Sequence, residues 1–146
     1  MSNRSCILLI DDSPGECELF RQALARADLD VALYAEHDAE AALHFLSDRA
    51  GREPLPAVVL LDWRLRNERG DGFLRKLRAD HRLAVIPVVV FSTSDDVADL
   101  SAAYANGTNS YVVKPGTFDE LVRCVRVMCR FWINCNVTPH MVESRC

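Results

Sequence analysis

The sequence lacks any apolar run that could cross a bilayer, which takes about 20 residues in a helix. Its beginning, MSNRSCILLIDD, offers only the short apolar stretch CILLI before two acids, which is not the form of a secretory signal. We therefore expect a cytoplasmic protein that makes no contact with a membrane.

An excess of basic residues is also missing. The chain has 17 Lys and Arg residues against 21 Asp and Glu residues, and its formal net charge is -4 at pH 7. A protein that binds nucleic acid through its phosphates needs a basic surface. We therefore expect no nucleic acid partner.

Paired cysteine motifs are absent, although the chain contains six cysteines. No two of them form a CxxC pair, and nothing indicates a secreted protein, so neither a zinc site nor a disulfide framework is favoured. We expect reduced thiols, most of them packed as small apolar side chains.

What is present is an alternation of two kinds of segment. The 146 residues suit one domain, and 49% of them are hydrophobic. Apolar runs of strand length, separated by segments of helical character, occur at 6–10, 31–35, 57–61, 86–91 and 110–113. This order predicts an α/β fold, in which a parallel sheet is covered by helices on both faces. Ligand sites in such folds lie beyond the carboxyl ends of the strands.

Capping residues mark the expected helix starts. Ser13, Pro14 and Glu16 fit an N-cap, a first-turn proline and a capping-box partner, and Thr117 with Glu120 repeats the capping pair for the last helix. The remaining helices are expected to start at Asp38, near Asp71 and near Asp95, with loops at 47–56 and 65–72.

Polar residues close the predicted strands and would meet along one edge of the sheet. Asp11 and Asp12 follow the first strand, Asp62 the third, Ser92 the fourth and Lys114 the fifth. One acid at a strand end is usually a turn residue or a helix cap, but the joint occurrence favours a shared cleft. Its carboxylates suit a hard divalent cation, while the hydroxyl and the ammonium suit phosphoryl oxygens. An aspartate in such a cleft can attack phosphorus and form an acyl phosphate.

These residues resemble the receiver domain of two-component response regulators, over about residues 5 to 130. The resemblance implies a flavodoxin-like (βα)5 three-layer sandwich with five parallel strands in the order 2-1-3-4-5. It implies that Asp62 is the phosphoacceptor, with Ser92 and Lys114 beside it, and that Mg²⁺ (or Mn²⁺) binds there. The implied metal ligands are the side chains of Asp12 and Asp62, Asp11 through water, and the backbone carbonyl of Arg64.

The resemblance also implies a switch. Phosphorylation would draw the Ser92 hydroxyl towards the phosphoryl group and turn Tyr111 inward, and the Lys114-Pro115 peptide would be cis.

The sequence departs from the family in three respects. Arg66 stands where a proline is frequent, the loop after the acceptor is about two residues longer, and Thr93 is bulkier than the usual alanine. We expect the Arg64 side chain to lie where hydrolytic water would approach the phosphate.

The segment after Lys114 is short, so we expect a receiver domain over 1–133 with an extended last helix and a tail over 134–146. In a regular helix over about 118–133, two apolar faces result. One face would pack on the sheet (Leu121, Val125, Met128, Trp132), and the other would need a cover (Cys124, Val127, Phe131). That cover would be a second copy in a homodimer or, alternatively, the tail folding back.

The expected function is that of a single-domain response regulator, phosphorylated on Asp62 by a sensor histidine kinase and acting through changed protein contacts. The ending VRVMCRFWINCNVTPH resembles regulators that partner cyanobacterial and bacterial phytochrome kinases, which implies a phytochrome-type donor. Such a protein catalyses only its own phosphoryl transfer and autodephosphorylation. The alternatives are a relay that passes phosphate to a second histidine and a pseudo-receiver that binds partners without phosphorylation. A haloacid dehalogenase-type phosphatase would need a second aspartate where Arg64 stands.

Overall fold

One parallel sheet of five strands forms the centre of the molecule, in the order β2-β1-β3-β6-β7. The computed structural model describes residues 4–143. The sheet strands are β1 (Cys6–Ile10), β2 (Ala32–Glu36), β3 (Val58–Leu61), β6 (Val88–Ser92) and β7 (Ser110–Val113). The predicted parallel sheet and its strand order, 2-1-3-4-5 when only these strands are counted, are confirmed.

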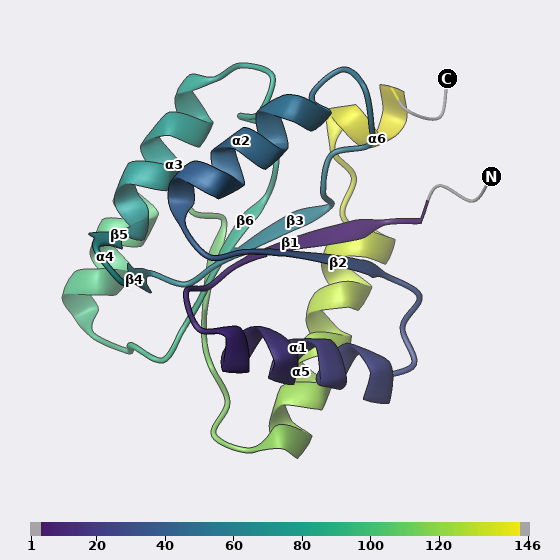
Figure 1. Ribbon diagram of the computed structural model, residues 1–146, viewed down its shortest axis with the longest axis vertical. Coiled ribbons are helices and arrows are strands. Elements are labelled where there is room, and N and C mark those ends of the chain that lie inside the picture. Colours follow the sequence, from purple (N-terminus) through teal and green to yellow (C-terminus); the bar gives the residue numbers. More distant parts are fainter. Residues whose placement is uncertain (1–3, 144–146) are drawn as a thin grey trace.

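Helices cover both faces of this sheet (Figure 1). They are α1 (Pro14–Arg26), α2 (Ala39–Arg49), α3 (Gly70–Ala79), α4 (Val97–Ala105) and α5 (Phe118–Cys129). Alternate residues of the buried β1 strand point to opposite sides: Ile7 and Leu9 pack with α1 and α5, whereas Leu8 and Ile10 pack with α2, α3 and α4. The result is the predicted three-layer sandwich. None of the helices described is both long and apolar enough to cross a membrane.

Side-chain caps begin four of these helices. Ser13, Asp38 and Thr117 accept backbone N–H groups at the starts of α1, α2 and α5, as predicted. At α4 the cap is Asp96, one residue after the position expected. Helix α3 begins at Gly70 without a side-chain cap.

The segment 65–72 was predicted to be a loop, and this prediction is wrong in part. It contains most of an antiparallel hairpin, formed by β4 (Arg64–Leu65) and β5 (Glu68–Arg69), and the start of α3. Two contacts stabilise the hairpin. Leu65 is buried in the core, and the Glu68 carboxylate accepts the Ala39 N–H at the start of α2 at 3.3 Å.

The Lys114-Pro115 peptide was predicted to be cis, and this prediction is also wrong, because no peptide bond in the described chain is cis. The trans isomer is the lower in energy by about 0.5–1 kcal/mol for a residue before proline. In this form the Lys114 N–H still donates to the Ser92 carbonyl at 2.8 Å, which extends the β6–β7 pairing up to the site.

The last helix is not regular over its predicted length. Helix α5 ends at Cys129 and continues as a π-helix, η1 (Arg130–Cys135), in which the Asn136 N–H donates to the Phe131 carbonyl at 2.7 Å. The predicted sheet-facing set is therefore wrong in part. Fully buried residues are Val122, Val125, Met128 and Cys129, while Leu121 and Trp132 are only partly buried.

The described part of the tail runs to the amino-terminal edge of the sheet, where it forms α6 (Pro139–Glu143) (Figure 1). There Pro139 and His140 line a pocket with Leu55 and Val85. As far as residue 143, the tail does not cover the last helix, because Val127 and Phe131 remain 66% and 50% exposed. The alternative in which the tail folds back over these residues is therefore wrong.

Candidate functional site

Four strands deliver polar residues to one edge of the sheet. Asp11 follows β1, Asp62 follows β3, Ser92 ends β6 and Lys114 follows β7. These strands are parallel neighbours in the sheet, so their carboxyl ends lie side by side. The structure thus brings together the residues that the sequence predicted to share a cleft.

Three carboxylates converge at this edge. Oxygen atoms of Asp11, Asp12 and Asp62 all lie within 4.8 Å of one another. Asp11 is buried, with 1% of its surface exposed, and the other two are half-buried. Like charges held this closely are unfavourable unless cations compensate them.

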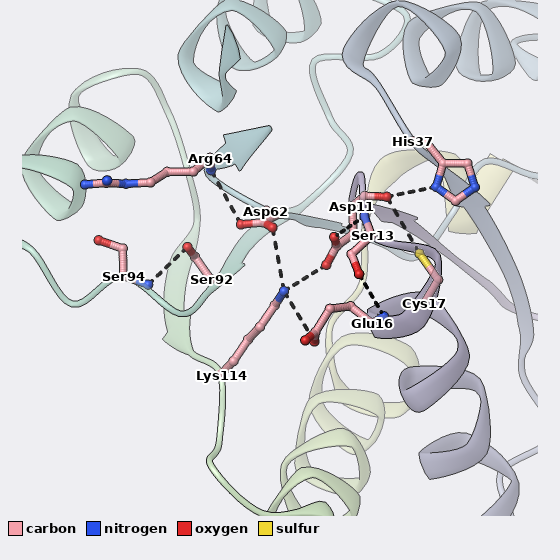
Figure 2. A network of polar contacts seen from close by, with 10 residues as sticks. All are labelled: Asp11, Ser13, Glu16, Cys17, His37, Asp62, Arg64, Ser92, Ser94 and Lys114. Atoms are coloured by element: carbon pink, nitrogen blue, oxygen red, sulfur yellow. Dashed lines mark hydrogen bonds and ion pairs between the residues drawn. The ribbon is translucent and has the colours of Figure 1, made fainter. Parts of the chain in front are cut away.

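One compensating cation is the Lys114 ammonium (Figure 2). Its Nζ lies 2.8 Å from Asp11 Oδ2, 3.6 Å from Asp62 Oδ2 and 3.7 Å from Glu16 Oε2. Burial alone would lower the pKa of Lys114, but the hydrogen bond to Asp11 and the nearby negative charges outweigh it, so the pKa is raised. Lys114 is therefore a permanent positive charge in the cleft.

The Asp62 carboxyl has a raised pKa, mainly because it is partly removed from water. The Lys114 charge opposes this effect, the Asp11 charge adds to it, and the Arg64 N–H stabilises the ionised form through a hydrogen bond to Oδ1 at 3.4 Å. Partial desolvation leaves a carboxylate less well hydrated than in bulk water. That is a suitable state for a nucleophile.

Asp11 is held in place from several directions. Its Oδ1 accepts the Ser13 N–H at 3.0 Å, and its carbonyl lies 2.9 Å from His37 Nδ1 and 3.7 Å from Cys17 Sγ (Figure 2). The predicted capping box is thus only half formed. The Ser13 N–H goes to Asp11, and the Glu16 carboxylate faces Lys114 instead of returning to the cap.

The predicted switch residues lie on the opposite side of Asp62. Ser92 is buried and its Oγ accepts the Ser94 N–H at 3.3 Å, whereas Thr93 is exposed. The half-buried Tyr111 donates its hydroxyl to the Ser94 carbonyl at 2.8 Å. A single backbone segment therefore contacts both the strand-end hydroxyl and the aromatic residue.

Arg64 does not lie as expected. Its guanidinium turns away from Asp62 (Figure 2). It donates from Nε to Asp99 Oδ2 at 2.9 Å, and its Nη2 forms an ion pair with the same oxygen at 2.8 Å. Asp99 is 2% exposed, and its pKa is lowered chiefly by the Ser94 hydroxyl and then by Arg64, against the effect of burial. Sequence reasoning missed Asp99 because an acid in the first turn of a helix is ordinary.

The acidic group fits a hard divalent cation. Mg²⁺ and Mn²⁺ prefer oxygen ligands, and the convergent oxygens of Asp11, Asp12 and Asp62 are of that kind. Asp12 is half-buried and lines a pocket with His37 and Arg66.

The residues predicted to form a dimer interface differ in exposure. Val127 and Phe131 are exposed apolar side chains on α5 and η1, and Phe131 packs edge-on against Trp132 at 4.8 Å between ring centroids. Cys124 is half-buried against the core formed with α1 and α5. The exposed apolar surface is thus smaller than the sequence suggested.

Known proteins share this chain's sequence pattern. A family model, the response regulator receiver domain, matches residues 7–126. The chain is 37% identical over 134 residues to the probable methanogenesis regulatory protein FilR2 of Methanothrix harundinacea, covering 91% of this chain and 86% of that one. It is 31% identical over 135 residues to the response regulator Rcp1 of Synechocystis, covering 91% and 92%.

Solved structures agree. The phosphorylated cyanobacterial phytochrome response regulator RcpA matches with a TM-score of 0.82 at 27% identity, over 93% of this chain and 99% of that one. The Mn²⁺-bound form of Rcp1 matches with a TM-score of 0.78 at 30% identity, over 92% and 99%. The acidic cleft, the strand order and the family match over most of the sequence lead to one conclusion: the chain belongs to the response regulator receiver domain family.

Proposed function

We propose that this protein is a phosphorylation-dependent switch, which accepts a phosphoryl group on Asp62 from a sensor histidine kinase and signals through altered protein contacts. The observation that carries the proposal is the convergence of Lys114 and two further aspartates on the half-buried Asp62. These groups come from separate strand ends, and together they place one cation and two further carboxylates beside Asp62.

In the proposed transfer, an Asp62 carboxylate oxygen attacks the phosphorus of a phosphohistidine. The new oxygen–phosphorus bond forms as the nitrogen–phosphorus bond breaks, and the electron pair stays with the leaving imidazole. Lys114, 3.6 Å from Asp62 before the reaction, offsets negative charge on the phosphoryl oxygens, and the Ser92 hydroxyl donates to one of them.

A divalent cation belongs to this proposal. Asp12 and Asp62 would bind Mg²⁺ (or Mn²⁺) directly, the Arg64 carbonyl would add a ligand, and Asp11 would act through water. The Mn²⁺-bound form of the related Rcp1 supports this assignment. When bound, the cation neutralises charge shared between the carboxylates and the phosphoryl oxygens.

The switch would use the segment around Ser92 and Thr93. Movement of the Ser92 hydroxyl towards a phosphoryl group changes its contact with the Ser94 N–H, and Ser94 in turn binds Tyr111. A phosphoryl group adds about -1.5 to -2 charge, enough to bias two packings of this segment. Pro115, directly after Lys114, would limit the movement of the chain on the other side.

The proposed phosphodonor is a phytochrome-type histidine kinase. Support comes from the relatives, because RcpA is a phytochrome response regulator and matches over nearly the whole chain. We propose that the protein acts in the cytoplasm. The cysteines described in the structure are free thiols, and a reducing compartment keeps thiols from forming disulfides.

The proposed output surface includes the end of the last helix, where two copies would pair through Val127 and Phe131, with Cys124 at the margin. The supporting observation is the 66% and 50% exposure of these two apolar side chains on adjacent turns. Apolar residues exposed in this way gain stability when a second copy covers them.

The phosphoacceptor is tested by intact-protein mass after incubation with acetyl phosphate, with and without Mg²⁺. We expect one added phosphoryl group, dependent on Mg²⁺ and absent in Asp62→Asn. Asp48→Asn is the matched control, because its carboxylate is exposed on α2. If wild type gains no mass from either acetyl phosphate or a cognate kinase, the switch is excluded and a phosphorylation-independent binding module becomes the better account.

The dimer is tested by light scattering of the phosphorylated protein after size exclusion. We expect Val127→Glu to shift the protein to monomer, because the charge would enter the apolar contact. Val97→Glu replaces a more exposed valine at the start of α4, away from the last helix, and should leave the mass unchanged. Dimers of equal stability in both variants would place the interface elsewhere.

A further inference from the structure

A buried carboxylate stands at the start of α4, and the proposed phosphoryl chemistry makes no use of it. Asp99 is 2% exposed, and its Oδ2 accepts hydrogen bonds from Arg64 Nε at 2.9 Å and from the Ser94 hydroxyl at 2.7 Å. The same oxygen forms an ion pair with Arg64 Nη2 at 2.8 Å. A buried charge is costly unless it is paired and hydrogen-bonded, and here two hydrogen bonds and an ion pair meet at one oxygen.

The guanidinium held by Asp99 starts from a residue beside the phosphoacceptor. The Arg64 N–H contacts Asp62 Oδ1 at 3.4 Å, yet the side chain leads away from Asp62 towards the segment that follows β6 (Figure 2). The Arg64 side chain is 60% exposed, so packing does not hold it there. Its partners are Asp99 and, at 3.7 Å, the exposed Asp96.

Once Asp62 is phosphorylated, the phosphoryl group competes with Asp99 for the Arg64 guanidinium. Guanidinium groups bind phosphoryl oxygens strongly, often through two parallel hydrogen bonds. The Asp99 carboxylate is the group that competes for the same donors. The balance between these two anions decides whether the Arg64 side chain lies over the phosphoryl group or beside α4.

We propose that Asp99 is a positioning residue that shortens the lifetime of phosphorylated Asp62 by holding the Arg64 guanidinium away from it. The proposal rests on the proposed phosphoacceptor function and adds a regulator to the same site. In the hydrolysis, a water oxygen bonds to phosphorus as the bond to the Asp62 oxygen breaks. The electron pair returns to the carboxylate, the water loses a proton to solvent, and inorganic phosphate leaves.

The position of the Arg64 side chain explains why Asp99 shortens the lifetime of phosphorylated Asp62 and does not lengthen it. While Asp99 holds Arg64, the outer side of the phosphoryl group stays open to water. Without Asp99, the guanidinium binds the phosphoryl oxygens, stabilises the acyl phosphate and occupies the approach of the water. Removing Asp99 therefore slows the loss of phosphate.

Asp99 also binds Ser94, so its replacement could act through the segment after β6. Ser94 contacts Ser92 and Tyr111, and a change there would alter the site without any part played by Arg64. A double-mutant cycle separates the two routes, because only the proposed route needs the guanidinium.

In the experiment, each protein is phosphorylated with acetyl phosphate and Mg²⁺ and freed of donor, and the phosphorylated mass is followed with time. The proteins are wild type, Asp99→Asn, Arg64→Ala and the double variant. We expect Asp99→Asn to lose phosphate about fivefold more slowly than wild type, a coupling of ordinary size for residues in contact. In the Arg64→Ala background, the same Asp99 substitution should cause no further change.

Several outcomes would overturn the proposal. One is that Asp99→Asn slows phosphate loss equally with and without the Arg64 side chain. The others are that Asp99→Asn leaves the lifetime of the phosphorylated protein unchanged or shortens it. Failure of wild type to label at all would instead overturn the phosphoacceptor function itself. A second measurement needs no variant: the Arg64 Nε–H resonance of wild type should stay protected from exchange after phosphorylation. Loss of that protection would mean that Arg64 leaves Asp99, contrary to the proposal.

Discussion

The Lys114 ammonium faces the carboxylates of Asp11, Asp62 and Glu16. The Lys114 side chain is 9% exposed, and the side chain of its nearest partner, Asp11, is 2% exposed. Removing one partner of a buried ion pair leaves an uncompensated charge, which costs more than the pair contributes. The lysine therefore has a role in stability as well as in the proposed transfer.

We predict that Lys114→Met lowers the free energy of unfolding by about 3–5 kcal/mol in the presence of EDTA. Mg²⁺ should recover part of this loss, because a cation that binds the folded carboxylates stabilises the folded state. Urea denaturation with and without Mg²⁺ measures both effects, and Lys76→Met, at an exposed position of α3, is the control. A Lys114→Met protein as stable as wild type in EDTA would show that Asp11 does not depend on the ammonium.

Asp99 gives a prediction about pH. Hydrogen bonds from Ser94 and Arg64 hold the folded-state pKa of Asp99 below the ordinary value of an aspartate. Its contribution to stability is therefore complete above about pH 4 and is lost as the pH falls through the folded-state pKa. We predict that Asp99→Asn is less stable than wild type at pH 7 and that the difference narrows at pH 3. Urea denaturation at the two pH values tests this, and a difference that widens in acid would contradict it.

At the scale of single residues, the sequence was informative where chemistry depends on position in a strand. Asp11, Asp62, Ser92 and Lys114 could be identified because each directly ends or follows an apolar run. The Arg64–Asp99 pair could not, because it joins residues 35 positions apart whose types are ordinary in their own segments.

For helices and strands too, features with local sequence signals could be predicted, and features that depend on tertiary contacts could not. The strands and most helix starts followed from apolar runs and capping residues, which are local signals. The β4–β5 hairpin was missed because its turn, Arg66 and Asn67, lacks the Asn-Gly type of signal that marks a tight hairpin. It depends on the burial of Leu65 and on the contact of Glu68 with α2, and both are tertiary.

The start of α3 shows how closely the segment after the phosphoacceptor is packed. A Cβ atom at Gly70 would lie 2.8 Å from Trp63 Cε3 and 2.9 Å from Leu61 Cδ2. Both neighbours are fully buried, so neither can move aside at low cost. At Gly72, in the same helix, a Cβ atom would meet nothing within 4 Å.

We predict opposite effects for two substitutions that differ only in position. Gly70→Ala should lower stability by about 1–3 kcal/mol through overpacking against Trp63. Gly72→Ala should raise it by about 0.5–1 kcal/mol, because alanine favours a helix over glycine. Thermal unfolding of both variants beside wild type measures the difference. Equal effects would mean that the packing around Trp63 is looser than the structure has it.

In the molecule as a whole, the edge where the strands end and the edge where they begin carry different groups. The carboxyl edge carries the acidic cleft, and the amino-terminal edge is met by the tail (Figure 1). Thr138 is 5% exposed, and Pro139 and His140 line a pocket with residues that precede β3 and β6. The sequence showed that a tail would follow the last helix but not where it would pack, because that depends on the irregular turn of η1.

This separation predicts that the tail affects stability but not phosphorylation. Deleting residues 136–146 should lower the free energy of unfolding by about 1–2 kcal/mol, because Thr138 is buried and His140 and Met141 are partly buried. The rate of labelling by acetyl phosphate should not change, because no tail residue contacts Asp11, Asp62 or Lys114 in the chain as described. Urea denaturation and labelling of the same preparation measure the two properties. A deletion variant that folds but labels much more slowly than wild type would show that the tail communicates with the cleft through α5, and the two edges would then have to be treated as coupled.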